Sequence, residues 1–196
     1  MKILVVSTVP LAYTGITNVI LNYLRFIDRS DMDITVLSTC RTMNWCLDEL
    51  KELNVKHVEL KRNNNPLKYL VKLVAFLKNR KFDIFHVHGN SSTLGVDLFA
   101  AKKAKIKVRI AHGHSVSCTH KLLHFLLKPL FWYSYTHGFA CSEKAGKWMF
   151  GSKEYYIIKN AFDIDKYKFD IRLRQQLREK MFLKNSTVIG DRKSVV

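Results

Sequence analysis

The chain has 196 residues, of which 47% are hydrophobic and 12% aromatic, a composition that excludes an intrinsically disordered protein and supplies one good hydrophobic core. It carries 33 Lys and Arg residues against 16 Asp and Glu, a formal net charge of +17. Such a charge creates a positive field that suits phosphates, whether of nucleic acid, of lipid headgroups or of a nucleotide-diphosphate ligand.

The first half of the chain alternates apolar runs with helical patterns. Residues 2–7 (KILVVS) form a continuous apolar run, typical of a buried parallel strand. From Ile16 to Ile27 apolar residues recur at helical spacing, which predicts a helix beginning just after Gly15. The next predicted elements are a strand over 33–37, a helix over 44–54 and a strand over 55–60. A further helix is predicted to begin with Asn65 as its N-cap and Pro66 as its first residue.

The second half repeats the alternation. The predicted strands cover 82–88, 107–112, 138–142 and 155–159, and the predicted helices cover 91–104, 119–137 and 143–150. About six strand–helix alternations with short links predict a doubly wound, Rossmann-like parallel sheet of the α/β class. We expect one such domain over 1–168, a helical connector capped by Asp170 over 169–186, and a truncated or aberrant start of a second domain over 187–196.

The cysteines and the lengths of the apolar runs bear on the cellular location of the protein. The four cysteines form no CxxC pair, which favours reduced thiols over a disulfide framework or a zinc ribbon. The start MKILVVSTVP does not resemble a signal peptide, and no apolar run approaches about 20 residues. We therefore expect a cytoplasmic protein, with a peripheral position at the inner face of the cell membrane left open.

Two histidine pairs stand where predicted strands end. His86 and His88 share one side of their strand, as do His112 and His114 if the next strand reaches that far. In doubly wound sheets ligands bind at the carboxyl ends of the strands, so these pairs and Gly15 predict a site at that edge. The imidazoles could bind metal, bind sugar, or be only satisfied polar residues. Carboxylates for a metallohydrolase site are scarce, so no metal is predicted.

The loop before the first predicted helix has two interpretations. A helix that begins at Gly15 offers free N–H groups to a phosphate or a sugar hydroxyl. The full GxGxxG fingerprint is absent, which disfavours a dehydrogenase-type dinucleotide site. The alternative is that this glycine only serves the turn.

Residues 118–137 combine many apolar and aromatic side chains with two lysines. One interpretation is a core helix kinked at Pro129. The other is an interfacial helix with Lys121 and Lys128 at anionic headgroups and Trp132 and Tyr133 below them. Nucleic acid is not a predicted partner, because basic charge is its only support and no recognition module is present.

Four segments together carry a resemblance to a known family. FDIFHVHG, KVRIAHGHS, FACSEKAGKWMFG and YYIIKNAFDIDKYKF occur in the order seen in the amino-terminal half of retaining family 4 glycosyltransferases of the GT-B fold. Over about residues 1–185 the chain looks most like bacterial members that build capsular or exopolysaccharide repeat units. The resemblance implies a nucleotide-diphospho-sugar donor, a glycan or polyprenyl-diphosphate-linked acceptor bound by this domain, and no cofactor.

The resemblance also implies roles for particular residues. His112 or His114 would be the catalytic histidine that reaches the donor sugar, and the choice between them is open. The implied substrate-binding residues lie in four segments and comprise Thr14, Gly15, His88, Gly89, Ser142, Glu143 and Asn160. Thr14 departs from the family pattern, which has a second glycine there.

The family's carboxy-terminal domain supplies most donor contacts and a pair of spaced glutamates, which this sequence lacks. We therefore expect the chain as written to be inactive or barely active alone. Two further hypotheses stay open: a sugar-nucleotide epimerase of the same fold, and a basic module that docks on anionic membrane without catalysis.

Overall fold

The computed structural model describes residues 1–62, 65–183 and 185–189. Its strands are β1 (Lys2–Ser7), β2 (Asp33–Ser38), β3 (Lys56–Glu59), β4 (Ile84–Gly89), β5 (Val108–Gly113), β6 (His137–Ala140) and β7 (Tyr156–Ile157). Its α-helices are α1 (Gly15–Phe26), α2 (Asn44–Glu52), α3 (Pro66–Arg80), α4 (Leu94–Lys103), α5 (Lys121–Ser134), α6 (Glu143–Phe150) and α7 (Ile171–Lys180), with a 3-10 turn at Asp165–Tyr167.

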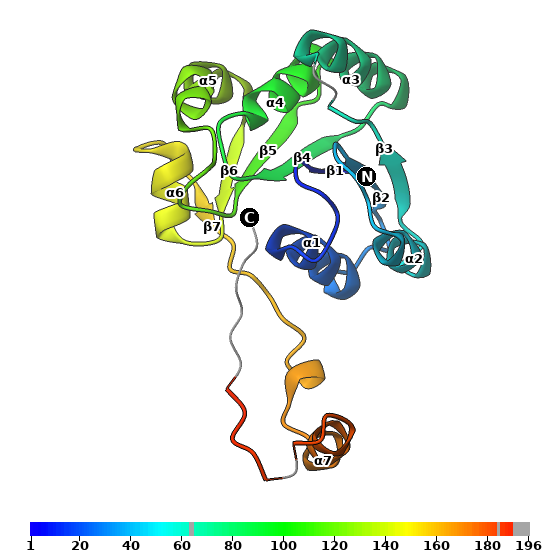
Figure 1. The fold of residues 1–196 in the computed structure, drawn as a ribbon. Coiled ribbons are helices and arrows are strands. Elements are labelled where there is room, and N and C mark those ends of the chain that lie inside the picture. The colour runs from blue at the N-terminus through cyan, green and yellow to red at the C-terminus, as the bar shows by residue number, and fades with distance from the viewer. Residues whose placement is uncertain (63–64, 184, 190–196) are drawn as a thin grey trace. The chain divides into compact units, whose positions relative to one another are not determined.

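The seven strands form one parallel sheet in the order β3-β2-β1-β4-β5-β6-β7 (Figure 1). The predicted doubly wound Rossmann-like fold is therefore confirmed. The strand order reverses between β1 and β4, which makes their carboxyl ends the topological switch point where such folds bind ligands. There Ser7 pairs with His88, and His88 pairs in turn with His112.

Alternating side chains divide the strands between two cores. Phe85 and Val87 of β4 belong to the larger core, together with residues of α3, α4, α5 and α6. Val5 of β1 belongs to the smaller core, which includes residues of α1 and α2. Figure 1 shows α3 to α5 on one face of the sheet and α1 and α2 on the other. Because strand side chains alternate, the even-numbered histidines of β4 fall on the α1 face.

Local capping explains where the helices begin. The side chain of Thr14 accepts the N–H of Thr17 at the start of α1, and Asn65 accepts that of Lys68 at the start of α3. Asp170 caps α7 as predicted. The predicted helix over 119–137 is shorter, because Tyr135 is extended and Thr136 donates its N–H to the Arg109 carbonyl, starting the next strand segment. Only two residues of the predicted strand over 155–159 pair with β6.

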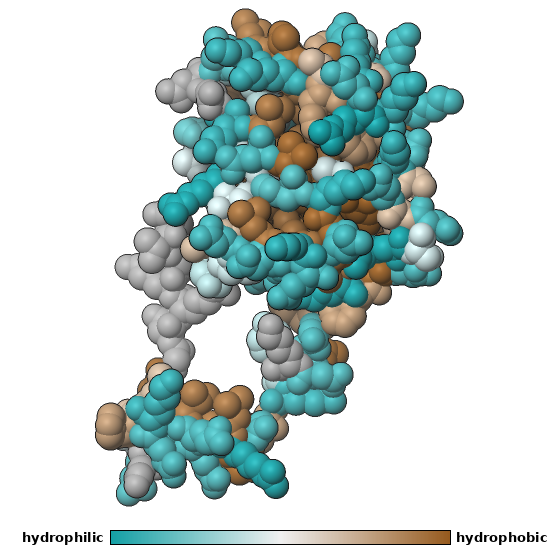
Figure 2. All heavy atoms as spheres, turned by 90° about the vertical axis from the view of Figure 1, so that its right-hand side faces the viewer, coloured by the Kyte–Doolittle hydropathy of each residue, from teal (hydrophilic) through white to brown (hydrophobic). Residues whose placement is uncertain are grey.

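The chain divides into two compact units, 1–161 and 162–196. The first ends before the boundary expected at residue 168. The second contains α7, within the expected helical connector, and α7 buries none of its residues. The exposed apolar side chains of the second unit include Phe169, Leu173 and Leu177, and Figure 2 shows apolar surface on this unit. Of the segment expected over 187–196, residues 190–196 lie outside the described residues.

A buried carboxylate joins α3 to α4 and to the segment after β3. Asp97 of α4 is fully buried, accepts a hydrogen bond from the Tyr69 hydroxyl at 2.5 Å, and forms an ion pair with Arg62. Burial raises the pKa of Asp97, against the opposing effects of Arg62 and the Tyr69 hydroxyl. Removing one member of such a network leaves the others without a partner.

We expect Asp97→Ala to lower the free energy of unfolding by about 3–5 kcal/mol, because it strands a largely buried guanidinium and a buried hydroxyl. Urea denaturation followed by circular dichroism measures this. Asp33→Ala is the matched control, since its carboxylate pairs with Lys56 at 2.8 Å on the surface. It should change stability by less than about 1 kcal/mol. Equal losses of stability in the two variants would contradict the assignment of Asp97 as the buried partner that stabilises Arg62 and Tyr69.

Candidate functional site

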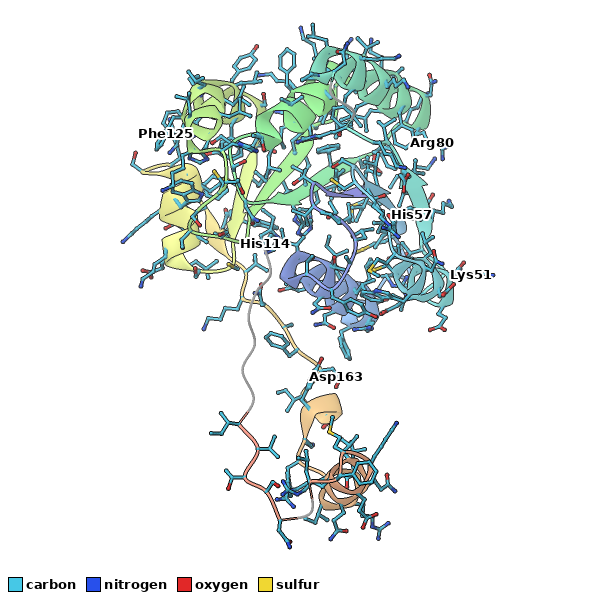
Figure 3. All side chains as sticks on the ribbon, in the orientation of Figure 1. Lys51, His57, Arg80, His114, Phe125 and Asp163 are labelled. Carbon is cyan, nitrogen blue, oxygen red and sulfur yellow. The ribbon has the colours of Figure 1, made fainter. Side chains whose placement is uncertain are left out.

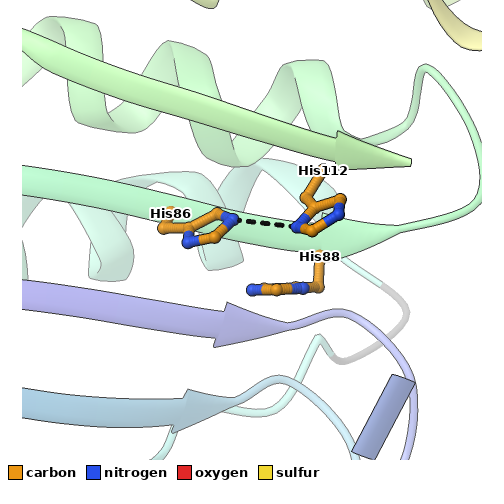
Figure 4. A group of neighbouring side chains, drawn as sticks. All are labelled: His86, His88 and His112. Carbon is orange, nitrogen blue, oxygen red and sulfur yellow. Dashed lines mark hydrogen bonds between the residues drawn. The ribbon is translucent and has the colours of Figure 1, made fainter. Parts of the chain in front are cut away.

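Four imidazoles, here called the histidine cluster, stack on the α1 face of β4 and β5: His86, His88, His112 and His114. Ring centroids lie 4.2 Å apart in the pairs His86–His88 and His112–His114, and 4.9 Å apart between His88 and His112. The sequence prediction that His86 and His88 share one side of their strand is confirmed. β5 ends at Gly113, one residue before His114, yet the His114 ring still stacks on His112, and the parallel register brings the two pairs together. Figure 4 shows three of the rings, and Figure 3 labels the fourth, His114, where β5 ends.

Hydrogen bonds link the rings across the two strands. His86 Nε2 lies 3.2 Å from His112 Nδ1, and His88 Nδ1 lies 2.9 Å from His114 Nε2. Burial is the main cause that lowers the pKa of all four rings, to about 3 for His86 and about 4 for His114. The rings are therefore neutral at neutral pH, each with one N–H and one lone pair.

The cluster forms the polar wall of an otherwise apolar hollow. A cavity of about 250 Å³ is lined by His86, His88 and His112. Its other walls come from β1, α1, β2, β6 and the segment after β7, and include Val5, Tyr23, Leu24, Ile34, Phe139 and Ile158. His112 is only 1% exposed, whereas His114 is half-buried and stands one residue past the strand end. His112 thus belongs to the hollow and His114 to the carboxyl edge of the sheet.

Two predicted glycines differ in what surrounds them. A Cβ built on Gly15, the first residue of α1, would have nothing within 4 Å, so the fold itself does not need a glycine there. A Cβ on Gly89 would lie 2.5 Å from Thr8 Oγ1 and 2.7 Å from Leu94 Cδ2. Gly89 therefore serves the packing of the β4 end, while Gly15 leaves a helix N-terminus open to a ligand.

The remaining predicted substrate-binding residues lie on other loops at this edge. Ser142 accepts the N–H of Ala145 and caps α6, of which Glu143 is the first residue. Asn160 is exposed in a segment fastened to α1, where Tyr23 donates its hydroxyl to the Lys159 carbonyl and Asn22 donates to that of Ala161. Direct contacts join His88, Gly89, His112 and His114, whereas Thr14, Gly15, Ser142, Glu143 and Asn160 occupy separate loops.

A second polar group at the end of β4 was not predicted. The His124 ring stacks on Trp148 with centroids 4.3 Å apart, and its Nδ1 accepts the N–H of Ser92 at 3.1 Å. Trp148 donates its indole N–H to the carbonyl of Asn90. Within the described part of the chain, Asn90 Oδ1, Ser92 Oγ and His124 Nε2 are buried without a hydrogen-bond partner. The polar run GNSS directly after a strand was the available signal.

Helix α5 presents an apolar surface instead of packing it. Its buried residues are His124, Phe131 and Ser134, so the core-helix interpretation is wrong for most of its apolar side chains. We call its exposed members the α5 patch: Leu122, Leu123, Phe125, Leu126, Trp132 and Tyr133. Phe125 lies at the outer edge of the unit in Figure 3.

Lysines accompany the aromatic rings of the α5 patch. The Lys128 ammonium lies 5.5 Å from the Trp132 ring centroid, and that of Lys102 lies 3.2 Å from the Tyr133 centroid. Lys121 is exposed at the start of the helix. Among the described residues, no helix is both long and apolar enough to traverse a bilayer.

No family model and no curated protein matches the chain. Solved structures do resemble it. HepE from Anabaena in complex with UDP has a TM-score of 0.70 at 17% identity, over 94% of this chain and 51% of its own. UDP-GlcNAc 2-epimerase from Neisseria meningitidis bound to UDP-GlcNAc has a TM-score of 0.61 at 18% identity, over 94% and 55%. MurG from Acinetobacter baumannii has a TM-score of 0.59 at 14% identity, over 85% and 47%.

These likenesses concern the fold. The chain spans about half the length of the solved structures it matches, and the identities are low. They agree with the Rossmann-like α/β fold expected from the sequence.

The neutral histidine cluster predicts a loss of stability in acid. The unfolded rings titrate near pH 6.5, whereas folded His86 and His114 titrate near 3 and 4. Between these values the unfolded chain binds more protons, so the free energy of unfolding should fall as pH falls from about 6.5 to 4, by up to about 1.4 kcal/mol per pH unit for each histidine.

Urea denaturation at several pH values, with EDTA present, measures this slope. His114→Gln should reduce it, while the same change at exposed His120 should not. A slope that is the same in both variants would show that the cluster does not cause the acid sensitivity.

Proposed function

We propose that the chain is the acceptor-binding half of a glycosyltransferase that transfers a sugar from a nucleotide-diphospho-sugar, with retention, in capsular or exopolysaccharide biosynthesis. One observation carries the proposal. The carboxyl edge of the sheet carries an open helix N-terminus at Gly15, after β1, and a neutral imidazole at His114, after β5, in a fold shared with UDP-bound HepE. Two of the motifs that resemble family 4, FDIFHVHG and KVRIAHGHS, contain β4 and β5 and end at this edge.

The chemistry of sugar transfer suits these groups. A retaining transfer develops an oxocarbenium-like centre and a departing diphosphate, so positioning and electrostatics should dominate catalysis. The α1 N-terminus offers N–H groups to a phosphate or hydroxyl oxygen, and the formal net charge of +17 favours an anionic ligand. Of the two candidate histidines we assign the cleft role to His114, because His112 is buried beside the hollow.

Epimerisation of a sugar nucleotide is the second candidate, since 2-epimerases share the fold. It would require acid–base carboxylates in the cleft. Within the described part of the chain, Asp97 is bound by Arg62 and Tyr69, and Glu59 at the end of β3 pairs with Lys61 at 3.0 Å. Among the predicted site residues, Glu143 is the one carboxylate. Because epimerisation would require more than one acid–base carboxylate in the cleft, we favour sugar transfer over epimerisation.

The α5 patch supports a membrane partner. Its exposed apolar side chains with neighbouring lysines form the pattern of an interfacial helix, in which ammonium groups meet anionic headgroups and aromatic rings lie below them. We propose that α5 rests on an anionic membrane and that the acceptor is polyprenyl-diphosphate-linked. Docking on the membrane without sugar transfer is the alternative, and the test of nucleotide-sugar binding below distinguishes the two.

Gly15→Ala should weaken ligand binding at least tenfold while the fold is retained, because the new methyl group would occupy the space in front of the α1 N-terminus. Saturation-transfer NMR with a panel of nucleotide-sugars and a short-chain polyprenyl-diphosphate sugar measures this. Asn18→Ala, at an exposed residue in the same helical turn, is the control and should bind as the wild type does. Unchanged binding by Gly15→Ala, or no binding of any member of the panel, would contradict the proposal.

Removing both aromatic side chains at Trp132 and Tyr133 should lower the affinity for anionic vesicles about tenfold or more. Co-sedimentation with phosphatidylglycerol-containing vesicles at low and high salt measures it, and high salt should weaken binding of the wild type. The control is a double alanine variant at Leu67 and Val71, which are 74% and 68% exposed on α3. If neither high salt nor the substitutions at Trp132 and Tyr133 changed the affinity for vesicles, α5 would not be the docking surface.

A further inference from the structure

Three rings of the histidine cluster have the spacing of metal ligands. His86, His88 and His112 each offer one ring nitrogen within 4.8 Å of the others, and Figure 4 shows the three rings gathered on one face of the sheet. His86 Nε2 and His112 Nδ1 are 3.2 Å apart. Two nitrogen ligands of tetrahedral zinc, each 2.0–2.1 Å from the ion, lie about 3.3–3.4 Å apart. For a metal ion to bind both nitrogens as neutral imidazoles, the proton between them must move to the other nitrogen of the ring that carries it.

The hydrogen bonds of the cluster do not satisfy all of its polar atoms. Four neutral imidazoles carry eight ring nitrogens, and His112 Nε2 and His114 Nδ1 are buried without a partner. A buried polar atom left without a hydrogen bond costs about 1–3 kcal/mol.

The fourth histidine is placed to orient a ligand. His114 Nε2 is hydrogen-bonded to His88 Nδ1 at 2.9 Å, which leaves His88 Nε2 as the nitrogen available for coordination. Metal-binding imidazoles commonly have the other ring nitrogen held in this way, because the bond fixes tautomer and ring orientation. His114 is thus a positioning residue for His88.

We propose that His86, His88 and His112 bind one divalent transition-metal ion, with zinc as the expected ion and a fourth coordination position open to the hollow. A set of neutral imidazoles without carboxylate or thiolate suits zinc, copper or nickel, and does not suit magnesium or calcium. The cavity of about 250 Å³ in front of these rings has room for a water or hydroxyl ligand, and its apolar walls surround the ion as in many metal sites. The metal site and the proposed sugar transfer share His114, but the test of sugar binding through Gly15 does not involve the metal ligands.

The test uses the tag-free chain, stripped of metal with EDTA. We expect isothermal titration with Zn²⁺ to give one tight site per chain, and Co²⁺ to give the intense visible absorption of a four-coordinate ion. His112→Gln and His86→Gln should abolish the tight site. His114→Gln should weaken metal binding 10–100-fold, because it removes the imidazole that orients His88. His120→Gln, at an exposed histidine outside the cluster, should leave it unchanged.

The measurements on the wild-type chain keep the proposal testable if a variant fails to fold. X-ray absorption of the zinc-loaded chain should give three imidazole nitrogens in the first coordination shell. Absence of a stoichiometric site, a shell without three imidazoles, or a site lost in His120→Gln and kept in His112→Gln would each overturn the proposal. Since sugar binding is measured separately through Gly15, failure of the metal site and failure of the proposed function are distinguishable.

Discussion

The parallel pairing of β4 with β5 places His88 directly opposite His112, and the whole candidate site depends on this register. Because side chains alternate along a strand, the same register puts His86 beside His112 and lets His114 reach back to His88 past the strand end. A slip of one residue would turn these rings into the core beneath α4, where Phe85 and Val87 now pack. The apolar residues between the histidines therefore fix the position of the polar ones.

The α1 face of the sheet divides into two parts with different physical character. Val5, Ile34 and Val36 of β1 and β2 pack with α1 and α2 into the smaller core, and Val5 and Ile34 also line the hollow. On β4 and β5 the same face carries the histidine cluster, next to a hollow that packing leaves open. Neutral rings are tolerated there because they bond to one another, and burial lowers their pKa values and so keeps them uncharged. The part of the face with room for a ligand is thus also the part with lone pairs to offer it.

Sequence periodicity predicted the elements well and their contacts poorly. The caps at Asn65 and Asp170 were predictable because capping is local, and so was the sharing of one side by His86 and His88. The bonds that join the histidine pairs link residues 26 positions apart, and the stack of His124 on Trp148 joins two helices. Such contacts depend on strand order and helix packing, which no local pattern specifies. His124 consequently seemed isolated in the sequence.

Identical residue types in the sequence can answer to different physical demands. Gly15 and Gly89 both follow strands of the switch point, yet only Gly89 is required by its neighbours, Thr8 and Leu94. At Gly15, the first residue of α1, packing does not explain the absence of a side chain. The α5 patch is a similar case. Its apolar composition was equally suited to a buried core helix and to an interfacial helix, and the exposure of its side chains favours the interfacial helix. In both cases the feature that packing fails to explain is the one that points to a ligand or a partner.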